Sequence, residues 1–219
     1  MHGTMAYSPY GVAARDRTRT LFGQTMGLVA VTAGFFALGS YLGRNITSTT
    51  VAFGAYIAAF VVLLVMRFAA RRSAGFSTAL LLIFGALMGV ATSPVLVFYA
   101  AYDPRILWQA GGATALFIGA FGSMGYLTRR NLFWLARVSF VALLALFAFG
   151  IVLIFVHIPH GSQVYAGLGL VVFAGLTMVD FQRLRRSQGL NSAPLLAASI
   201  FLDILNVFFF FLRIFANDE

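Results

Sequence analysis

The chain has 219 residues, of which 61% are hydrophobic and only 10% are charged, and its mean hydropathy is +0.92. A soluble domain is about half apolar and about a quarter charged, so this composition excludes a soluble globular protein and indicates one polytopic membrane domain. All 15 basic residues are arginine and cysteine is absent. These absences exclude a retinal-binding lysine, disulfides, thiolate metal sites and cysteine nucleophiles.

Seven apolar stretches are long enough to cross a bilayer, which takes about 20 residues of α-helix. In chain order they are Leu21–Leu42, Val51–Ala70, Phe76–Ala101, Ile106–Leu127, Leu132–Val156, Val164–Phe181 (with the helix continuing further) and Leu195–Phe215. The connections are short. We therefore expect an all-α, seven-helix transmembrane bundle over residues 21–216, with an arginine-rich tail before it (1–20) and a short tail after it (217–219).

The arginines predict the orientation of the bundle. Three lie in the N-terminal tail and three in or near each of the second-to-third, fourth-to-fifth and sixth-to-seventh connections. Only Arg44, Arg105 and Arg213 lie on the opposite side. Because cytoplasmic connections carry the excess of arginine, we expect a cytoplasmic N-terminus and a C-terminus outside. These flanking positions also account for the net charge of +9 without a nucleic-acid partner.

Asp180 and Asp203 are the two acidic residues that lie within the last two helices. A charged aspartate at the centre of a membrane helix costs about 2.5–3.5 kcal/mol on the insertion scale. Acidic residues in such places usually face the bundle interior and mark ion or proton pathways. The three histidines lie outside the apolar stretches, so we expect no transition-metal site and no cofactor.

The spacing of these aspartates predicts that they lie at the same depth. Asp180 lies nine residues before Gly189, a natural helix C-cap, and Asp203 nine residues after Pro194, a natural first-turn residue. At 1.5 Å per residue both lie roughly 13 Å from the hairpin. Antiparallel neighbours can bring the carboxylates together, where they would share a proton or hold a hard cation such as calcium.

Other residues of the last helix are candidates for supporting roles. Ser199 and Asn206 share a face with Asp203. The run Phe208, Phe209, Phe210 and Phe211 is a packing or lipid-facing segment, or alternatively a hydrophobic gate. For Asp180 a second interpretation stays open: it lies close to the membrane interface and pairs with Arg183 or Arg186.

Several segments together resemble one family. Thr177-Met-Val-Asp-Phe-Gln-Arg-Leu184 is similar to a sixth-helix Tyr-Asp-Thr-Gln signature, and Phe201-Leu-Asp-Ile-Leu-Asn-Val-Phe208 to a seventh-helix Leu-Asp-Phe-Ile-Asn-Leu-Phe signature. Shorter matches are Ser73-Ala-Gly75, Ala86-Leu-Met-Gly89 with Ser93-Pro94, and Gly125-Tyr-Leu-Thr128. Over nearly all seven helices the chain resembles the bacterial branch of the Bax inhibitor-1 family.

This resemblance implies a seven-helix fold with the last helix central, in a bacterial inner membrane. It implies a pH-sensing pair at Asp180 and Asp203, a pH-dependent calcium leak, and a second-helix arginine that latches onto the pair. The latch position aligns with Ala69, so Arg67 is our candidate and Arg71 the runner-up. Val179 and Phe181 flank Asp180 where the family has Tyr and Thr.

Two alternative functions differ in class from a leak. Some bacterial relatives are thought to modulate a membrane-bound protease or a stress response, and the N-terminal tail is a candidate surface for such a partner. Two membrane aspartates also describe an intramembrane aspartyl protease. Such proteases resemble one another in a Gly-x-Gly-Asp and a Pro-Ala-Leu motif, whereas Asp203 follows Ile200-Phe-Leu202 and no Pro-Ala-Leu comes after it. We therefore expect no enzyme.

Overall fold

The computed structural model describes residues 9–46, 48–70, 73–187, 189 and 192–216, with side chains from residue 20 onward. Over these residues the protein consists of α-helices and one short 3₁₀ turn, with no strand. The helices are α1 (Pro9–Leu42), α2 (Thr49–Ala69), α3 (Ala74–Tyr102), α4 (Pro104–Leu127), α5 (Phe133–Phe155), α6 (Gly161–Arg186) and α7 (Ala193–Phe215); the turn η1 is Gly43–Asn45. All seven helices are long and apolar enough to cross a membrane, which confirms the predicted architecture.

Two helix boundaries differ from the prediction. α1 begins at Pro9, so the second half of the predicted tail is helical, although its membrane-length portion begins at Thr20. α6 continues past Phe181 as predicted but ends at Arg186, three residues before the predicted C-cap Gly189, and its last turn carries three arginines. At the start of α1 a polar segment extends an apolar helix. Hydropathy marks where a helix enters the membrane, which is a different position from its end.

Local capping explains where α3 and α4 start. The Ser73 side chain accepts a hydrogen bond from the Phe76 backbone N–H at the start of α3 (3.4 Å). At the start of α4, Asp103 Oδ1 accepts from the Arg105 N–H (2.8 Å), and Pro104 occupies the first turn. The two caps fix short connections, so consecutive helices run antiparallel as in an up-and-down bundle.

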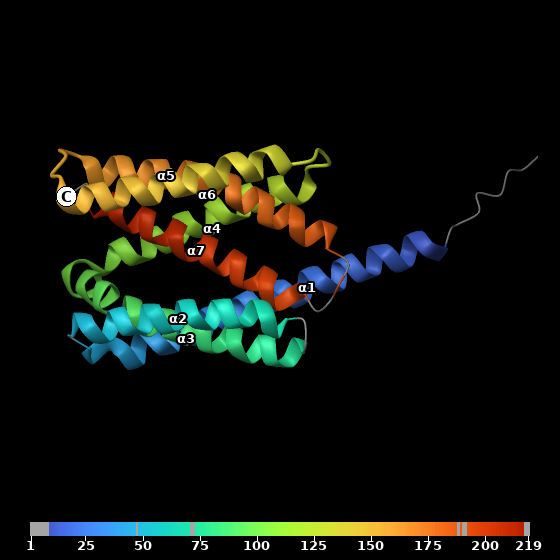
Figure 1. The fold of residues 1–219 in the computed structure, drawn as a ribbon, viewed down its shortest axis with the longest axis horizontal. Helices are drawn as coiled ribbons and strands as arrows, with labels where there is room; N and C mark the ends of the chain where they lie inside the picture. The colour runs from blue at the N-terminus through green and yellow to red at the C-terminus, as the bar shows by residue number, and fades with distance from the viewer. Residues whose placement is uncertain (1–8, 47, 71–72, 188, 190–191, 217–219) are drawn as a thin grey trace, which may run out of the picture.

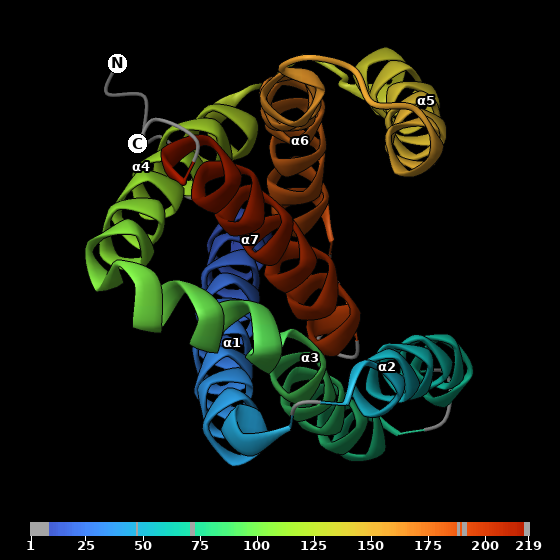
Figure 2. The same ribbon diagram turned by 90° about the vertical axis from the view of Figure 1, so that its left-hand side faces the viewer.

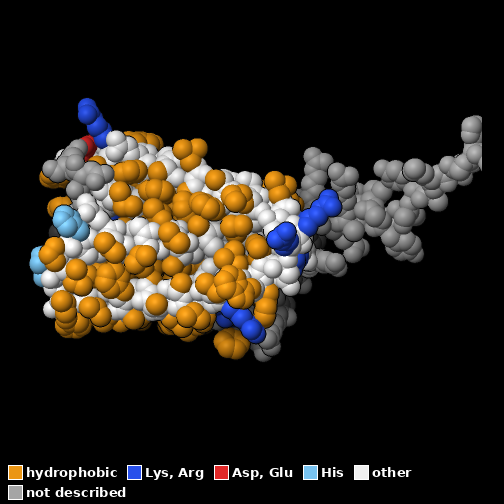
Figure 3. Space-filling view, turned by 90° about the horizontal axis from the view of Figure 1, so that it is seen from above, with side chains coloured by type: hydrophobic (Ala, Val, Ile, Leu, Met, Phe, Trp, Pro, Cys, Tyr) orange, Lys and Arg blue, Asp and Glu red, His pale blue; other side chains and the backbone are white. Residues whose placement is uncertain are grey.

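α7 lies at the centre of the bundle, as the end-on view in Figure 2 shows. It packs against α1, α2, α3, α4 and α6, and it has the largest buried share of the seven helices. α5 packs mainly on α6 and is otherwise peripheral (Figures 1 and 2). Hydrophobic side chains cover the long sides of the molecule, whereas arginine and histidine side chains lie towards its ends (Figure 3). This distribution fits a surface that faces lipid along its length.

α1 and α3 approach each other closely through small residues. A Cβ at Gly89 of α3 would overlap the backbone of Phe36 and Ser40 in α1. The Ser40 hydroxyl also donates to the Gly89 carbonyl (3.2 Å). Next to this contact, Phe201 of α7 packs edge-on against Phe84 and Phe36 (centroid distances 6.1 and 6.0 Å). The closely packed pair α1–α3 therefore forms a rigid surface against which α7 packs.

Candidate functional site

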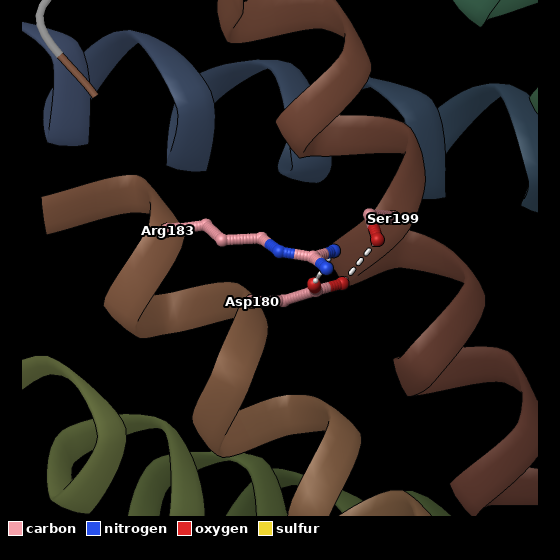
Figure 4. Close-up of polar contacts among 3 residues, drawn as sticks. All are labelled: Asp180, Arg183 and Ser199. Atoms are coloured by element: carbon pink, nitrogen blue, oxygen red, sulfur yellow. Dashed lines mark hydrogen bonds and ion pairs between the residues drawn. The ribbon is translucent and has the colours of Figure 1, made fainter. Parts of the chain in front are cut away.

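Asp180 is a buried carboxylate near the end of α6, with two partners. Its side chain is only 8% exposed, and Arg183 Nη1 lies 3.1 Å from Oδ1. The Ser199 hydroxyl of α7 donates a hydrogen bond to Oδ2. Figure 4 shows both contacts converging on the carboxylate, with the Arg183 side chain lying alongside it. Each oxygen of Asp180 therefore has a donor, and its charge is balanced by an arginine whose side chain is 62% exposed.

Asp203 is also buried, but its surroundings differ. It is 5% exposed, and its Oδ2 has no hydrogen-bond partner among the described residues. Its neighbour on α6 is Thr177, which is fully buried and whose hydroxyl also lacks a partner in the described part of the chain. Asp180 is close enough to act on Asp203 electrostatically. The Thr177 hydroxyl thus lies within reach of the Asp203 carboxylate, but neither Oδ2 nor that hydroxyl has a hydrogen bond of full geometry among the described residues.

Thr177 differs from three other buried threonines and resembles Thr25 of α1, whose hydroxyl also has no partner among the described residues. Thr32, Thr92 and Thr114 each donate their hydroxyl to the carbonyl four residues earlier in the same helix. A threonine in an apolar helix normally satisfies itself in this way. Thr177 makes no such bond in the described structure, although the carbonyls of its own helix are at hand. Its hydroxyl lies beside the Asp203 carboxylate instead.

The two aspartates are staggered by about one helical turn, which corrects the prediction of equal depth. Ser199, which lies one turn before Asp203, is level with Asp180, and Asp203 is level with Thr177. The helix bounds agree: α6 ends at Arg186 and α7 begins at Ala193. At 1.5 Å per residue Asp180 lies about 9 Å and Asp203 about 15 Å from these ends. The prediction was wrong because it continued α6 to Gly189, whereas the backbone is already extended at Ser187.

A cavity of about 700 Å³ opens beside Asp180, between α2, α6 and α7. Arg67, Asp180, Arg183 and Ser199 are among its lining residues, and Asp203 is not. The predicted latch Arg67 therefore shares a cavity with Asp180, but the ion pair that the described residues make is with Arg183. The runner-up, Arg71, lies outside the described residues. With two guanidinium groups against one carboxylate, the cavity is net positive.

Comparison with known proteins identifies the family. The sequence profile described as "Inhibitor of apoptosis-promoting Bax1" matches residues 18–219. The chain belongs to the Bax inhibitor-1 family. An uncharacterized membrane protein of Streptococcus pyogenes serotype M1 is 28% identical over 215 residues, covering 90% of this chain and 93% of the relative. The inner membrane protein YbhL of Escherichia coli K12 is 29% identical over 157 residues, covering 67% and 66%.

These relatives and the seven apolar helices make this Bax inhibitor-1 family protein a multi-pass protein of a bacterial inner membrane, in contact with the lipid bilayer. The relatives are described only as membrane proteins, so the chemistry of the site has to come from its own residues. The resemblance noted in Thr177–Leu184 and Phe201–Phe208 corresponds to the two segments that meet at the aspartates.

The donors at the aspartates of this Bax inhibitor-1 family protein are all oxygens. Asp180, Asp203, Thr177 and Ser199 suit a hard cation, because carboxylate and hydroxyl oxygens are the ligands that calcium prefers. Calcium takes six to eight oxygens, and no group of three or more acidic, histidine or cysteine side chains occurs in the part of the chain that the structure describes.

The remaining predicted residues of α7 lie in different settings. The Asn206 side chain donates to the Leu202 carbonyl of its own helix (2.8 Å). Phe210 is buried against Tyr165, Phe173 and Gly169. Phe211 stacks on Phe215 and contacts Phe117, and Phe208 contacts Phe209 edge-on. The four phenylalanines therefore pack between helices. Their role as a gate remains a prediction.

A polar clamp holds α6 next to this site. Gln182 is buried and donates to the Arg130 carbonyl (2.7 Å), and it accepts from the Leu132 N–H (3.1 Å). Arg186 reaches the same connection, at the Arg130 carbonyl and Asn131 Oδ1 (3.3 Å each). Arg186 is thus committed to the α4–α5 connection, which leaves Arg183 as the partner of Asp180 among these α6 arginines.

Proposed function

We propose that this protein is a pH-sensitive cation leak, with calcium as a transported ion, in which Asp180 and Asp203 form the ion site and the pH sensor. The observation that carries the proposal is the buried Asp203 carboxylate, whose Oδ2 has no hydrogen-bond partner among the described residues and which lies beside the Thr177 hydroxyl. A proton on Asp203 neutralises the buried carboxylate. A cation there is bound by both oxygens, so proton and cation compete for one place.

The described arrangement corresponds to a closed state in this proposal. Arg183 occupies Asp180, and Arg67 adds a second positive charge to the cavity that leads to it. A cation entering this cavity is repelled until Arg183 leaves Asp180. When Asp203 is protonated, nothing deeper attracts the cation. When it is ionised, the cation is drawn in. Flux should therefore rise with pH, and each aspartate should be needed for that dependence.

Two features support a leak over an intramembrane aspartyl protease. A protease needs two carboxylates that share one proton around a single water. Here both oxygens of Asp180 have donors, Arg183 and Ser199, and Asp203 lies a turn away. We accordingly propose no enzymatic activity. Loss of cleavage of a transmembrane reporter in either Asp180→Asn or Asp203→Asn would favour the protease instead.

Reconstituted liposomes test the proposal. The purified full chain is reconstituted with a calcium indicator inside, and flux is followed between acid and alkaline pH for the wild type, Asp180→Asn and Asp203→Asn. Asp103→Asn is the matched control, because Asn also caps a helix and Asp103 lies at the start of α4. We expect pH-dependent flux that both site variants lose and the control keeps.

A flux that ignores pH and both substitutions would overturn the proposal. Because the liposomes contain no other protein, the experiment also separates an intrinsic leak from modulation of a membrane-bound protease. A protein that acts only through such a partner would show no flux there.

A further inference from the structure

A second cavity adjoins the site on another side of Arg183. It has a volume of about 440 Å³ and lies between the start of α5, the end of α6 and the start of α7. Among the described residues, Arg183 and Leu196 line both this cavity and the one beside Asp180. Arg183 is therefore the charged group that the two cavities share.

The charged lining of this second cavity is entirely basic. It contains the guanidinium groups of Arg183 and Arg186, and no acidic residue occurs among its described lining residues. The two arginines are three residues apart on α6, so they are neighbours on the surface of the helix. Arginine stays charged throughout the physiological pH range. The described lining therefore carries two positive charges and no negative one, whereas the first cavity also contains Asp180.

Both guanidinium groups have hydrogen-bond donors to spare. A guanidinium carries five N–H donors in a planar fork. Among the described residues, Arg183 Nη1 donates to Asp180, and Arg186 makes two bonds of 3.3 Å each to the α4–α5 connection. Both arginines are exposed. Each can therefore bind an oxyanion with its remaining donors, and no buried group loses a partner.

The frame around this cavity is fixed by hydrogen bonds of its own. The buried Gln182 side chain donates to the Arg130 carbonyl and accepts from the Leu132 N–H. Asn131 Oδ1 accepts from the Phe133 N–H at the start of α5 (3.1 Å). The α4–α5 connection is thus tied to α6 at this point. A ligand meets a formed cavity in which the arginine side chains are the main groups left to order, which lowers the cost of binding.

We propose that this cavity binds a phosphate group, held between Arg183 and Arg186. Guanidinium and phosphate pair through two parallel N–H···O bonds, and both groups are charged, which strengthens them. Basic pockets between transmembrane helices also suit phosphate-bearing lipid headgroups. Free inorganic phosphate and the headgroup of an anionic phospholipid offer the same chemistry to the two arginines.

The bound phosphate competes with Asp180 for Arg183. The Arg183 side chain reaches the carboxylate from the next turn of α6 (Figure 4), and it is 62% exposed. An exposed ion pair of this kind is weak, so a phosphate in the second cavity can draw Arg183 away from it. Asp180 then lacks its positive partner, which favours cation entry. That last consequence, unlike the binding itself, rests on the function proposed above.

Thermal unfolding of the full chain in uncharged mixed micelles tests this inference without a measurement of flux. Inorganic phosphate replaces chloride at constant ionic strength in one arm. Phosphatidylglycerol replaces phosphatidylcholine in the other. The dependence of the unfolding midpoint on ligand concentration gives an apparent Kd. We expect the midpoint to rise with concentration in at least one arm, and the arm that shows the rise identifies the source of the phosphate.

Four variants connect the binding to the cavity. Arg183→Gln and Arg186→Gln should each raise the apparent Kd about tenfold, as loss of one charge-assisted hydrogen bond gives. Asp180→Asn should lower the apparent Kd by up to about fivefold, because it frees Arg183 from an exposed ion pair. Arg137→Gln is the matched control. Arg137 lies one turn into α5, over the Phe133 ring (4.4 Å), but does not line the cavity, so the Kd should stay at the wild-type value.

Three results would overturn the inference. No rise of the midpoint in either arm would mean that the cavity binds no phosphate. An equal weakening in Arg137→Gln would mean that the positive charge of this end as a whole attracts the anion. An apparent Kd that Asp180→Asn leaves unchanged would contradict the competition for Arg183.

The design keeps this inference separate from the proposed leak. Because neither arm measures flux, failure of the leak in liposomes would leave the binding result intact, and the reverse also holds. Arg186 is exposed and makes its bonds at the surface, so Arg186→Gln keeps the test valid if Arg183→Gln folds poorly.

Discussion

Ser199 on α7 donates its hydroxyl to Asp180 on α6, and this hydrogen bond sets the register of the two helices at the site. It makes Ser199 the residue level with Asp180 and leaves Asp203 one turn deeper, beside Thr177. The site is therefore built as two successive levels, one satisfied and one unsatisfied. The difference predicts that removing the hydroxyl of Ser199 lowers stability, whereas removing that of Thr177 does not.

Ser199→Ala removes the donor from Asp180 Oδ2. We expect the free energy of unfolding to fall by about 1–2 kcal/mol, the range for hydrogen bonds in membrane proteins and to charged groups. The loss should be larger at alkaline than at acid pH, since an ionised carboxylate depends more on its donor. Reversible unfolding in mixed micelles at two pH values measures both effects. Ser199→Thr, which keeps the hydroxyl, should retain most of the stability, and an equal loss in that variant would contradict the role of the hydrogen bond.

Thr177→Val replaces an unpaired hydroxyl with a methyl group of nearly the same shape. Because the hydroxyl makes no hydrogen bond of full geometry in the described structure, we expect stability to change by no more than about 1 kcal/mol. Cation flux should nevertheless fall about tenfold, as loss of one ligand worth about 1–1.5 kcal/mol would give.

The matched control for this substitution is Thr114→Val. Its hydroxyl donates to the Ala110 carbonyl (2.7 Å), and it lies on α4. That variant should leave flux unchanged. If Thr177→Val kept the wild-type flux, the hydroxyl beside Asp203 would have no part in conduction.

Arg183→Gln frees Asp180 and removes one of the two guanidinium groups from its cavity. We expect calcium flux at neutral pH to increase by up to about fivefold, since an exposed ion pair contributes up to about 1 kcal/mol. The flux assay in liposomes measures this directly. Arg186→Gln is the control, because Arg186 bonds the α4–α5 connection instead. An unchanged or lower flux in Arg183→Gln would mean that this ion pair does not hold the site closed.

The sequence predicted the fold well because a membrane imposes a length and an apolar surface on each helix. All seven stretches are helices, and α7 is central. The starts and ends were less predictable. α1 extends back to Pro9, since a polar segment continues a helix without a hydropathy signal, and α6 ends at Arg186 before the predicted cap Gly189.

Most residues of the site were predicted from the sequence, but their relative positions along the two helices were not. Asp180, Asp203 and Ser199 lie on facing helices, and Arg183 was among the partners weighed for Asp180. The stagger depends on where the α6–α7 connection begins, which a few residues decide. Thr177 was not singled out because a threonine in an apolar helix usually bonds its own backbone, as Thr32 does. Its unbonded hydroxyl is visible only in three dimensions.

The rigid surface that positions α7 depends on close contact between α1 and α3, and Gly89→Ala tests it. A Cβ at Gly89 would meet backbone atoms of Phe36 and Ser40, which cannot move aside as a flexible side chain would. We expect a loss of about 1–3 kcal/mol in the free energy of unfolding, typical of overpacking.

Gly112→Ala on α4 is the matched control for this substitution, because a Cβ there meets nothing within 4 Å. Alanine is the better helix former, so that variant should be neutral or more stable by up to about 1 kcal/mol. Unfolding of both variants in the same micelles gives the comparison. Similar stabilities of the two variants would mean that α1 and α3 move apart at little cost. The α1–α3 pair would then not be the rigid surface that positions α7 at the site.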